Sequence, residues 1–169
     1  MTIKVNHIRT LAGTQLRKAT EELKNNNKIG RIGWVKGAQY KDGMNVAYIA
    51  TIQDQGYPPG NIPARPFMKP TVKKNKAKWD EYIRKSIIAL LQGKMSIDGV
   101  LKGLVEIGKG DLQAEIKSIL SPPLKPATIK RRVNKFKNKV ATKSLEKPLV
   151  DTAVMLNSIT GDVVDKGTP

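Results

Sequence analysis

The sequence predicts an α+β fold, in which a small, mainly antiparallel sheet is covered by an N-terminal helix and two longer helices. Three long segments place apolar residues at helical spacing, whereas two short segments alternate apolar and polar residues as strands do. A proline-rich stretch at residues 56–70 and a basic stretch at residues 125–147 interrupt this pattern. They predict an extended arm and an open basic loop, because prolines break regular hydrogen bonding and like charges repel.

The length and composition limit the kind of protein this can be. With 169 residues, 39% of them hydrophobic, the chain is expected to form one domain spanning residues 1–169. It contains no cysteine and one histidine, His7, and it lacks Ser-His-Asp, phosphate-loop and zinc-ligand patterns. The sequence therefore predicts a protein that is not an enzyme and binds no cofactor or metal. No apolar run approaches the ~20 residues of a membrane span, so a soluble product without membrane contact is expected.

The first predicted helix covers residues 6–26 and is amphipathic. Its apolar side chains follow one helical face, which is the pattern of a helix that packs on a sheet. These side chains are Ile8, Leu11, Leu16, Ala19 and Leu23. The run Asn25-Asn26-Asn27 is a plausible end for this helix.

The next segment changes to the period of a strand. Residues 29–36 alternate apolar and polar side chains and predict the first strand. The turn signal Asp42-Gly43 follows, and residues 44–48 fit a strand that pairs back across it. Residues 46–53 also fit a short helix, so both interpretations stay open on the pattern alone.

The second half of the chain predicts two long helices and a final strand. Residues 71–91 and 96–120 keep apolar side chains on one helical face, and the first residue of the second segment is a serine suited to capping. A short helix ending near Asn157 precedes the last predicted strand at residues 158–164. Residues 165–169 are expected to form a free tail.

Three residues of the proline-rich arm, together with Asp54 just before it, are candidate contact residues. Ile62 and Phe67 are expected to dock, because leaving such side chains in water costs about 1.5–3 kcal/mol each relative to burial. Arg65 lies between two prolines and presents a stiffened guanidinium to a carboxylate, for which Asp54 is a candidate. These four residues are predicted to contact another subunit or partner. The alternative is that the arm is fixed to the core of its own chain.

The charge predicts a polyanionic partner. Lysine and arginine number 31 against 14 acidic residues, which gives a formal net charge of +17. The candidate contacts are Lys73, Lys74, Lys130, Arg131, Arg132, Lys135, Lys137 and Lys139. Because the basic stretch holds a single aromatic, Phe136, contacts with nucleic acid would be phosphate contacts that are sequence-independent and salt-sensitive. An acidic protein neighbour that orders this stretch is the alternative.

Two blocks of sequence resemble a known family. The first is Val46-Ala47-Tyr48-Ile49-Ala50, Asp54-Gln55-Gly56 and Ile62-Pro63-Ala64-Arg65-Pro66-Phe67. The second is Pro126-Ala127-Thr128-Ile129, Lys147-Pro148-Leu149-Val150-Asp151-Thr152 and Met155-Leu156-Asn157-Ser158-Ile159. In this order they resemble the head-tail joining and tail-completion proteins of long-tailed bacteriophages and prophages, over roughly residues 46–164. Thr152-Ala153 departs from the Thr-Gly expected in that family, which puts a glycine-type turn there in doubt.

The resemblance implies a structural virion protein of the phage neck or tail, made in the host cytoplasm. Such a protein forms a ring of identical subunits around the DNA channel, and its partners are itself, other neck, connector or tail proteins, and the DNA. The resemblance also favours the helix interpretation of residues 46–53, with a helix running up to Gly56 in a left-handed conformation. The competing hypothesis is a sequence-independent nucleic-acid-binding protein that uses residues 125–147.

Overall fold

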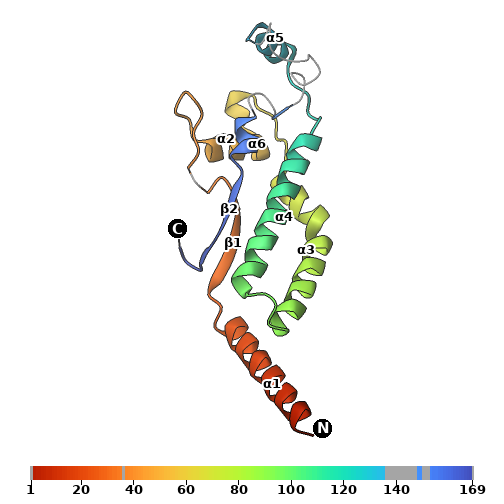
Figure 1. Ribbon diagram of the computed structural model, residues 1–169. Helices are drawn as coiled ribbons and strands as arrows, with labels where there is room; N and C mark the ends of the chain where they lie inside the picture. Colours follow the sequence, from red (N-terminus) through yellow and green to blue (C-terminus); the bar gives the residue numbers. More distant parts are fainter. Residues whose placement is uncertain (1, 36, 136–147, 150–152, 169) are drawn as a thin grey trace. The chain divides into compact units, whose positions relative to one another are not determined.

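The computed structural model describes residues 2–35, 37–135, 148–149 and 153–168, and the side chains of these residues except 2–12 and 135. Within these residues the predicted α+β class is confirmed: helices accompany a sheet of two antiparallel strands (Figure 1). The helices are α1 (Thr2–Lys24), α2 (Val46–Gln55), α3 (Met68–Leu91), α4 (Ile97–Ser118), α5 (Pro126–Lys135) and α6 (Val154–Asn157), with a short 3-10 helix at Pro58–Gly60. The strands are β1 (Lys28–Gly33) and β2 (Thr160–Asp165).

The chain divides into two compact units, each of which is described by itself. The first unit consists of Met1–Arg31, Lys76–Gly108 and Asp162–Pro169. The second unit consists of Ile32–Asn75 and Lys109–Gly161. The single domain expected from the chain length stays a prediction.

The second unit is built around one apolar core. Its buried members are Val46, Ala50, Phe67, Leu112, Ile116, Met155, Leu156 and Ile159. Trp34 closes this core, because its ring meets the ring of Phe67 edge-on at a centroid distance of 5.9 Å. The indole N–H of Trp34 also donates to the carbonyl of Met155 at 2.8 Å. Helices α2 and α6 both supply buried residues to this core and lie side by side (Figure 1).

Residues 46–53 are helical, as the resemblance implied, and the strand interpretation of 44–48 is wrong. The side chain of Asn45 accepts hydrogen bonds from two amides of the first turn of α2, so it caps the helix. The helix ends at Gly56, which has a positive φ of 82° but an extended ψ of 165° rather than a left-handed helical one. A Cβ at Gly56 would lie 2.8 Å from the backbone nitrogen of Ala64, so glycine is required there.

The proline-rich arm is not extended throughout, contrary to the prediction. Pro58–Gly60 forms a 3-10 turn, which Tyr57 and Ile62 close by exchanging two backbone hydrogen bonds. Helix α3 begins at Met68, so Pro70 lies in its first turn. Proline is tolerated there because the first amides of a helix have no partner within the helix.

The basic loop predicted at residues 125–147 begins as a helix instead. Helix α5 covers Pro126–Lys135, with a proline at its first position, where the missing N–H costs nothing. The sequence predicts at most one or two helical turns here, capped by Thr128 and ending near Arg132, and α5 continues beyond them. Residues 136–147 lie outside the described residues.

The first unit pairs parts of α3 and α4. Ser96 caps α4 as predicted, through a hydrogen bond from the Gly99 amide to its hydroxyl at 3.2 Å. The Tyr82 hydroxyl donates to the carbonyl of Val100, and a Cβ at Gly103 would collide with this same hydroxyl. A small residue is therefore needed where these two helices approach each other.

The C-terminal tail of the first unit is anchored rather than free. The Lys166 amide donates to the carbonyl of Asn27 at 2.6 Å. Arg31 forms an ion pair with Asp162 at 3.0 Å and donates to the carbonyl of Thr168 at 3.2 Å. The hydrogen bond to Asp162 is the main reason that the pKa of Arg31 is raised above its usual value.

Candidate functional site

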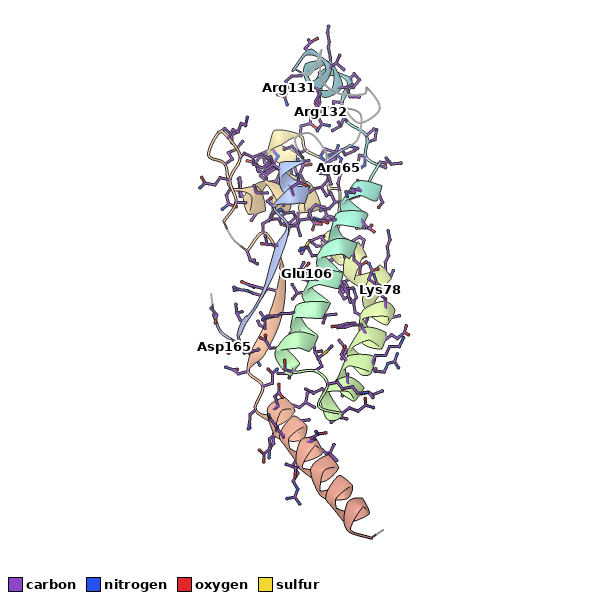
Figure 2. All side chains as sticks on the ribbon, viewed as in Figure 1. Arg65, Lys78, Glu106, Arg131, Arg132 and Asp165 are labelled. Atoms are coloured by element: carbon purple, nitrogen blue, oxygen red, sulfur yellow. The ribbon has the colours of Figure 1, made fainter. Side chains whose placement is uncertain are left out.

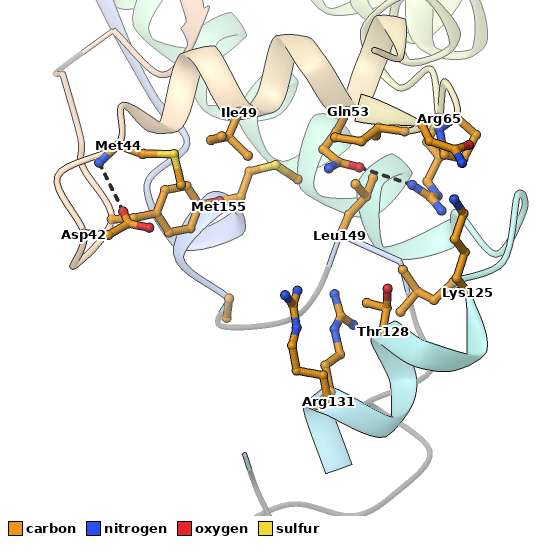
Figure 3. Close-up of a pocket in the computed structure, with 17 residues that line it drawn as sticks. Asp42, Met44, Ile49, Gln53, Arg65, Lys125, Thr128, Arg131, Leu149 and Met155 are labelled. Atoms are coloured by element: carbon orange, nitrogen blue, oxygen red, sulfur yellow. Dashed lines mark hydrogen bonds between the residues drawn. The ribbon is translucent and has the colours of Figure 1, made fainter. Parts of the chain in front are cut away.

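The second unit contains a pocket of about 500 Å³ that is lined by both cations and apolar side chains (Figure 3). We call it the cationic pocket. Its lining residues are Tyr40, Asp42, Met44, Ile49, Gln53, Asn61, Ile62, Pro63, Arg65, Leu124, Lys125, Thr128, Arg131, Arg132, Leu149, Ala153 and Met155. They come from α2, the arm, α5, the residues around these elements, and the start of α6.

Arg65 is a buried cation of the pocket that is held by several hydrogen bonds. It is only 5% exposed. Its guanidinium donates to the carbonyl of Pro122 at 2.8 Å, the carbonyl of Pro123 at 3.2 Å and the side-chain oxygen of Gln53 at 3.2 Å. Its backbone amide donates to the carbonyl of Gln53 at 2.8 Å. These acceptors fix the side chain in place, but all of them are neutral.

The electrostatic environment of Arg65 is positive. Burial lowers the pKa of Arg65 because it removes water from the charged form, and the positive charge of Arg132 lowers it further. Lys125 and Arg131 line the same pocket, and Figure 2 shows Arg131 and Arg132 together on α5. Among the lining residues only Asp42 is acidic, and Figure 3 shows it at the opposite end of the pocket from Arg65.

Asp54 does not pair with Arg65, which corrects the predicted contact. Its carboxylate accepts hydrogen bonds from the amides of Phe67 at 2.7 Å and Met68 at 2.9 Å. Met68 is the first residue of α3, so Asp54 acts as an anionic cap on a helix that begins far from it in sequence. The carboxylate ties the end of α2 to the start of α3.

The other two arm residues lie inside the chain or in the pocket wall. Phe67 is fully buried in the core of the second unit, so in this structure it is not available to another subunit. Ile62 is half-buried and lines the cationic pocket. The arm is therefore fixed to its own core, as the alternative interpretation held, and a role for Ile62 and Arg65 in partner contacts stays a prediction.

The predicted polyanion contacts fall into several environments. Lys73 and Lys130 are exposed, whereas Lys74 forms an ion pair with Glu115 of α4 at 2.7 Å. Arg131 is exposed, and Arg132, on the same helix, is only 8% exposed. Lys135 belongs to α5 but its side chain is not described, and Lys137 and Lys139 lie outside the described residues.

The part of the chain that the structure describes holds neither a cluster of metal-binding side chains nor a membrane-spanning helix. Among them no group of three or more His, Asp or Glu side chains lies close enough to hold a metal ion. None of the helices that the structure describes is long and apolar enough to cross a membrane. What the pocket offers is guanidinium and ammonium donors beside an apolar wall.

No family model, curated protein or solved structure matches this chain.

Several pocket residues were missed by the sequence reasoning. Gln53 and the carbonyl groups of Pro122 and Pro123 hold Arg65, and Leu149 and Met155 supply the apolar wall. The pattern of side chains in a sequence does not show which backbone carbonyls accept hydrogen bonds. The contacts of Arg65 with the carbonyls of Pro122 and Pro123 could therefore not be predicted. Gln53 had a signal in the sequence, since it directly precedes Asp54, a residue of the first block that carries the family resemblance.

Proposed function

We propose that this chain is a structural protein of the neck or tail of a long-tailed phage or prophage, which joins or completes the head-tail interface as a ring of subunits around the DNA channel. The observation that carries the proposal is that the two blocks resembling that family contribute to one core. The buried residues they supply are Val46, Ala50, Phe67, Met155, Leu156 and Ile159. Blocks that are distant in sequence but packed together form one structural unit, as expected if both were inherited as parts of one fold.

Exposed side chains on the second unit support a role in assembly. Tyr48 is 61% exposed and Tyr57 is 43% exposed, although both are large aromatic residues. Met44, at 48%, is also exposed and lines the cationic pocket. Tyrosine and methionine are enriched at protein–protein interfaces, where they contribute contact area. A closed ring requires that each subunit contact its neighbour through two different surfaces.

The test is an in vitro joining assay with purified components. Phage heads and tails that lack the protein are mixed with the purified chain, and joined particles are counted by negative-stain electron microscopy. The expected result is joining that depends on the chain, with ring-shaped density at the neck or the tail end. A matched variant, Tyr48→Ser with Tyr57→Ser, should fold normally but join fewer particles. If the chain promotes no joining and associates with neither heads nor tails, the proposed function is wrong.

A sequence-independent nucleic-acid-binding function is the second candidate. The observation that favours it is helix α5, which presents Lys130 and Arg131 to solvent on a ten-residue helix. Filter binding of duplex and single-stranded DNA across a salt series tests it. Affinity that falls steeply with salt, without any joining activity, would favour this function over the neck or tail protein.

A further inference from the structure

The geometry of the cationic pocket points to a binding site for a carboxylate on an acidic segment of a partner protein, with Arg65 and Arg131 as the groups that bind it. The inference goes beyond the proposed function, because it concerns an interaction that the isolated chain can make with any protein of suitable sequence. It rests on three features of the pocket: a buried and preorganised guanidinium, an excess of positive charge, and an apolar wall beside the cations.

The buried guanidinium of Arg65 is prepared for an anion. Its contacts with Gln53, Pro122 and Pro123 fix the plane of the group before any ligand arrives. A guanidinium carries more N–H groups than these three acceptors use, so donors remain on the terminal nitrogens. Because the acceptors are neutral, the charge is still available to a carboxylate. Little side-chain ordering is then needed on binding.

The surrounding charges favour an anion in the same place. Figure 3 shows Arg131 reaching into the pocket from α5, and Lys125 from the residue just before α5. Like charges converging on one cavity repel each other, and an anion bound between them relieves that repulsion. A carboxylate fits a guanidinium in a paired, planar geometry with two parallel hydrogen bonds.

The apolar wall distinguishes a protein segment from nucleic acid. Ile49, Ile62, Leu149 and Met155 line the pocket together with its cations. An acidic peptide can place a carboxylate against Arg65 and a neighbouring aliphatic side chain against this wall. A nucleic-acid backbone offers phosphates and polar sugars but no aliphatic side chain to bury against this wall, and Tyr40 is the sole aromatic among the lining residues for a base to stack on. At about 500 Å³ the pocket holds a few side chains but not a duplex.

The test uses a short peptide in which glutamate and leucine alternate, with both ends blocked. Binding to the full chain is measured by isothermal titration calorimetry at about 150 mM salt, where long-range attraction to the basic surface is screened. The same peptide with glutamine in place of glutamate is the ligand control. We expect it to bind at least about tenfold more weakly, because the charge-assisted hydrogen bonds are lost. Inorganic phosphate and a DNA duplex are added as competitors.

A matched pair of variants on α5 separates the pocket from general charge attraction. Arg131→Gln and Lys130→Gln each remove one exposed positive charge from adjacent positions of the same helix, but only Arg131 lines the pocket. Arg131→Gln should weaken the glutamate peptide about three- to tenfold, and Lys130→Gln by less than about twofold. Arg65→Lys keeps the charge but not the planar fork, and should also weaken binding while the chain stays folded by circular dichroism.

Methionine methyl groups report where the peptide binds. With methyl-labelled methionine, the NMR signals of Met44 and Met155 should shift on titration, because both residues line the pocket. Met68 and Met95 are outside it and serve as internal controls. The inference is overturned if the two α5 variants weaken binding equally, if the glutamine peptide binds as well, or if Met95 shifts as Met155 does. Equal or tighter binding of the duplex, with the same dependence on Arg131, would instead make the pocket a phosphate site.

Discussion

Asp54 offers the sharpest test of how the second unit is held together. Its carboxylate accepts hydrogen bonds from the amides of Phe67 and Met68, at 2.7 and 2.9 Å. Phe67 is fully buried, so its amide has no ready substitute partner when the carboxylate is removed. The Met68 amide belongs to an exposed residue and can be hydrated. Asp54→Ala therefore removes two hydrogen bonds. Water cannot replace the bond to the buried Phe67 amide, but it can replace the bond to the Met68 amide.

The expected loss of unfolding free energy is about 2 kcal/mol. Leaving a buried donor without a partner costs about 1–3 kcal/mol, and loss of a helix cap costs about 0.5–2 kcal/mol. The two ranges describe overlapping contacts and are not summed. Asp54→Asn keeps an oxygen acceptor but loses the charge that interacts with the N-terminus of α3, so about half of the loss is expected.

Trp34 provides a local probe for this experiment. Its ring contacts Phe67 edge-on, so its fluorescence reports on the unit that contains Asp54. Urea unfolding is followed in a Trp79→Phe background, in which Trp34 is the remaining tryptophan. The control is Asp42→Ala, which removes a carboxylate that accepts from the Met44 amide in an exposed turn. It should cost less than about 0.5 kcal/mol. A loss that small for Asp54→Ala would show that the capping contact does not stabilise the fold.

Three further changes test other features of the structure. Ala153 has a left-handed φ of 55°, so Ala153→Gly should stabilise the second unit by about 0.5–1 kcal/mol in urea unfolding. The control is Ala114→Gly on the exposed face of α4, which should destabilise the unit by a similar amount. Gly103→Ala should destabilise the first unit by about 1–3 kcal/mol because its Cβ meets the Tyr82 hydroxyl, and Tyr82→Phe should recover part of the loss in thermal unfolding. Hydrogen bonds from Lys102 and Lys28 hold the pKa of Asp98 below its ordinary value, so its stabilising contribution is present at neutral pH and is lost as the pH falls through that lowered pKa. The wild-type chain should therefore lose more stability on acidification than Asp98→Asn, as seen in urea midpoints across a pH series.

The long helices could be predicted because their signals are local and repeated. Residues 71–91 and 96–120 were expected to be helical, and α3 and α4 cover Met68–Leu91 and Ile97–Ser118. The serine before α4 caps it as its position indicated. Each of these features depends on residues within a few positions of one another, so tertiary contacts do not need to be known to recognise them.

The arm and the basic stretch are harder to predict, because two local tendencies are outweighed there by helix position and by burial. The prolines of residues 56–70 predict that no helix forms there, but Pro70 occupies the first turn of α3, where its missing N–H has no cost. Charge repulsion was expected to keep the basic stretch open. Ile129 and Val133, one helical turn apart in α5, are both half-buried, and burying them offsets repulsions worth only a few tenths of a kcal/mol each.

Ala153 shows that a departure from a family pattern does not by itself predict the backbone conformation at that position. The missing glycine put a glycine-type turn there in doubt, yet Ala153 adopts the left-handed conformation that a glycine would take. The turn leads into α6, whose Met155 and Leu156 are buried in the core of the second unit. Burial of these two side chains exceeds the cost of roughly 1–2 kcal/mol for an alanine with positive φ. The sequence alone could not show whether the cost of a positive φ or the gain from burying Met155 and Leu156 would determine the backbone conformation of Ala153.

Arg65 marks the limit of what could be predicted for the site. Its position between two prolines indicated a stiffened side chain and a carboxylate partner, but the acceptors in the chain are Gln53 and the carbonyls of Pro122 and Pro123. Two consecutive prolines cannot continue a helix or a strand ladder, so their carbonyls remain available to a side-chain donor. Neutral acceptors hold the guanidinium without cancelling its charge. The same side chain can therefore fix the arm to its own core and still bind a carboxylate that enters the pocket from outside.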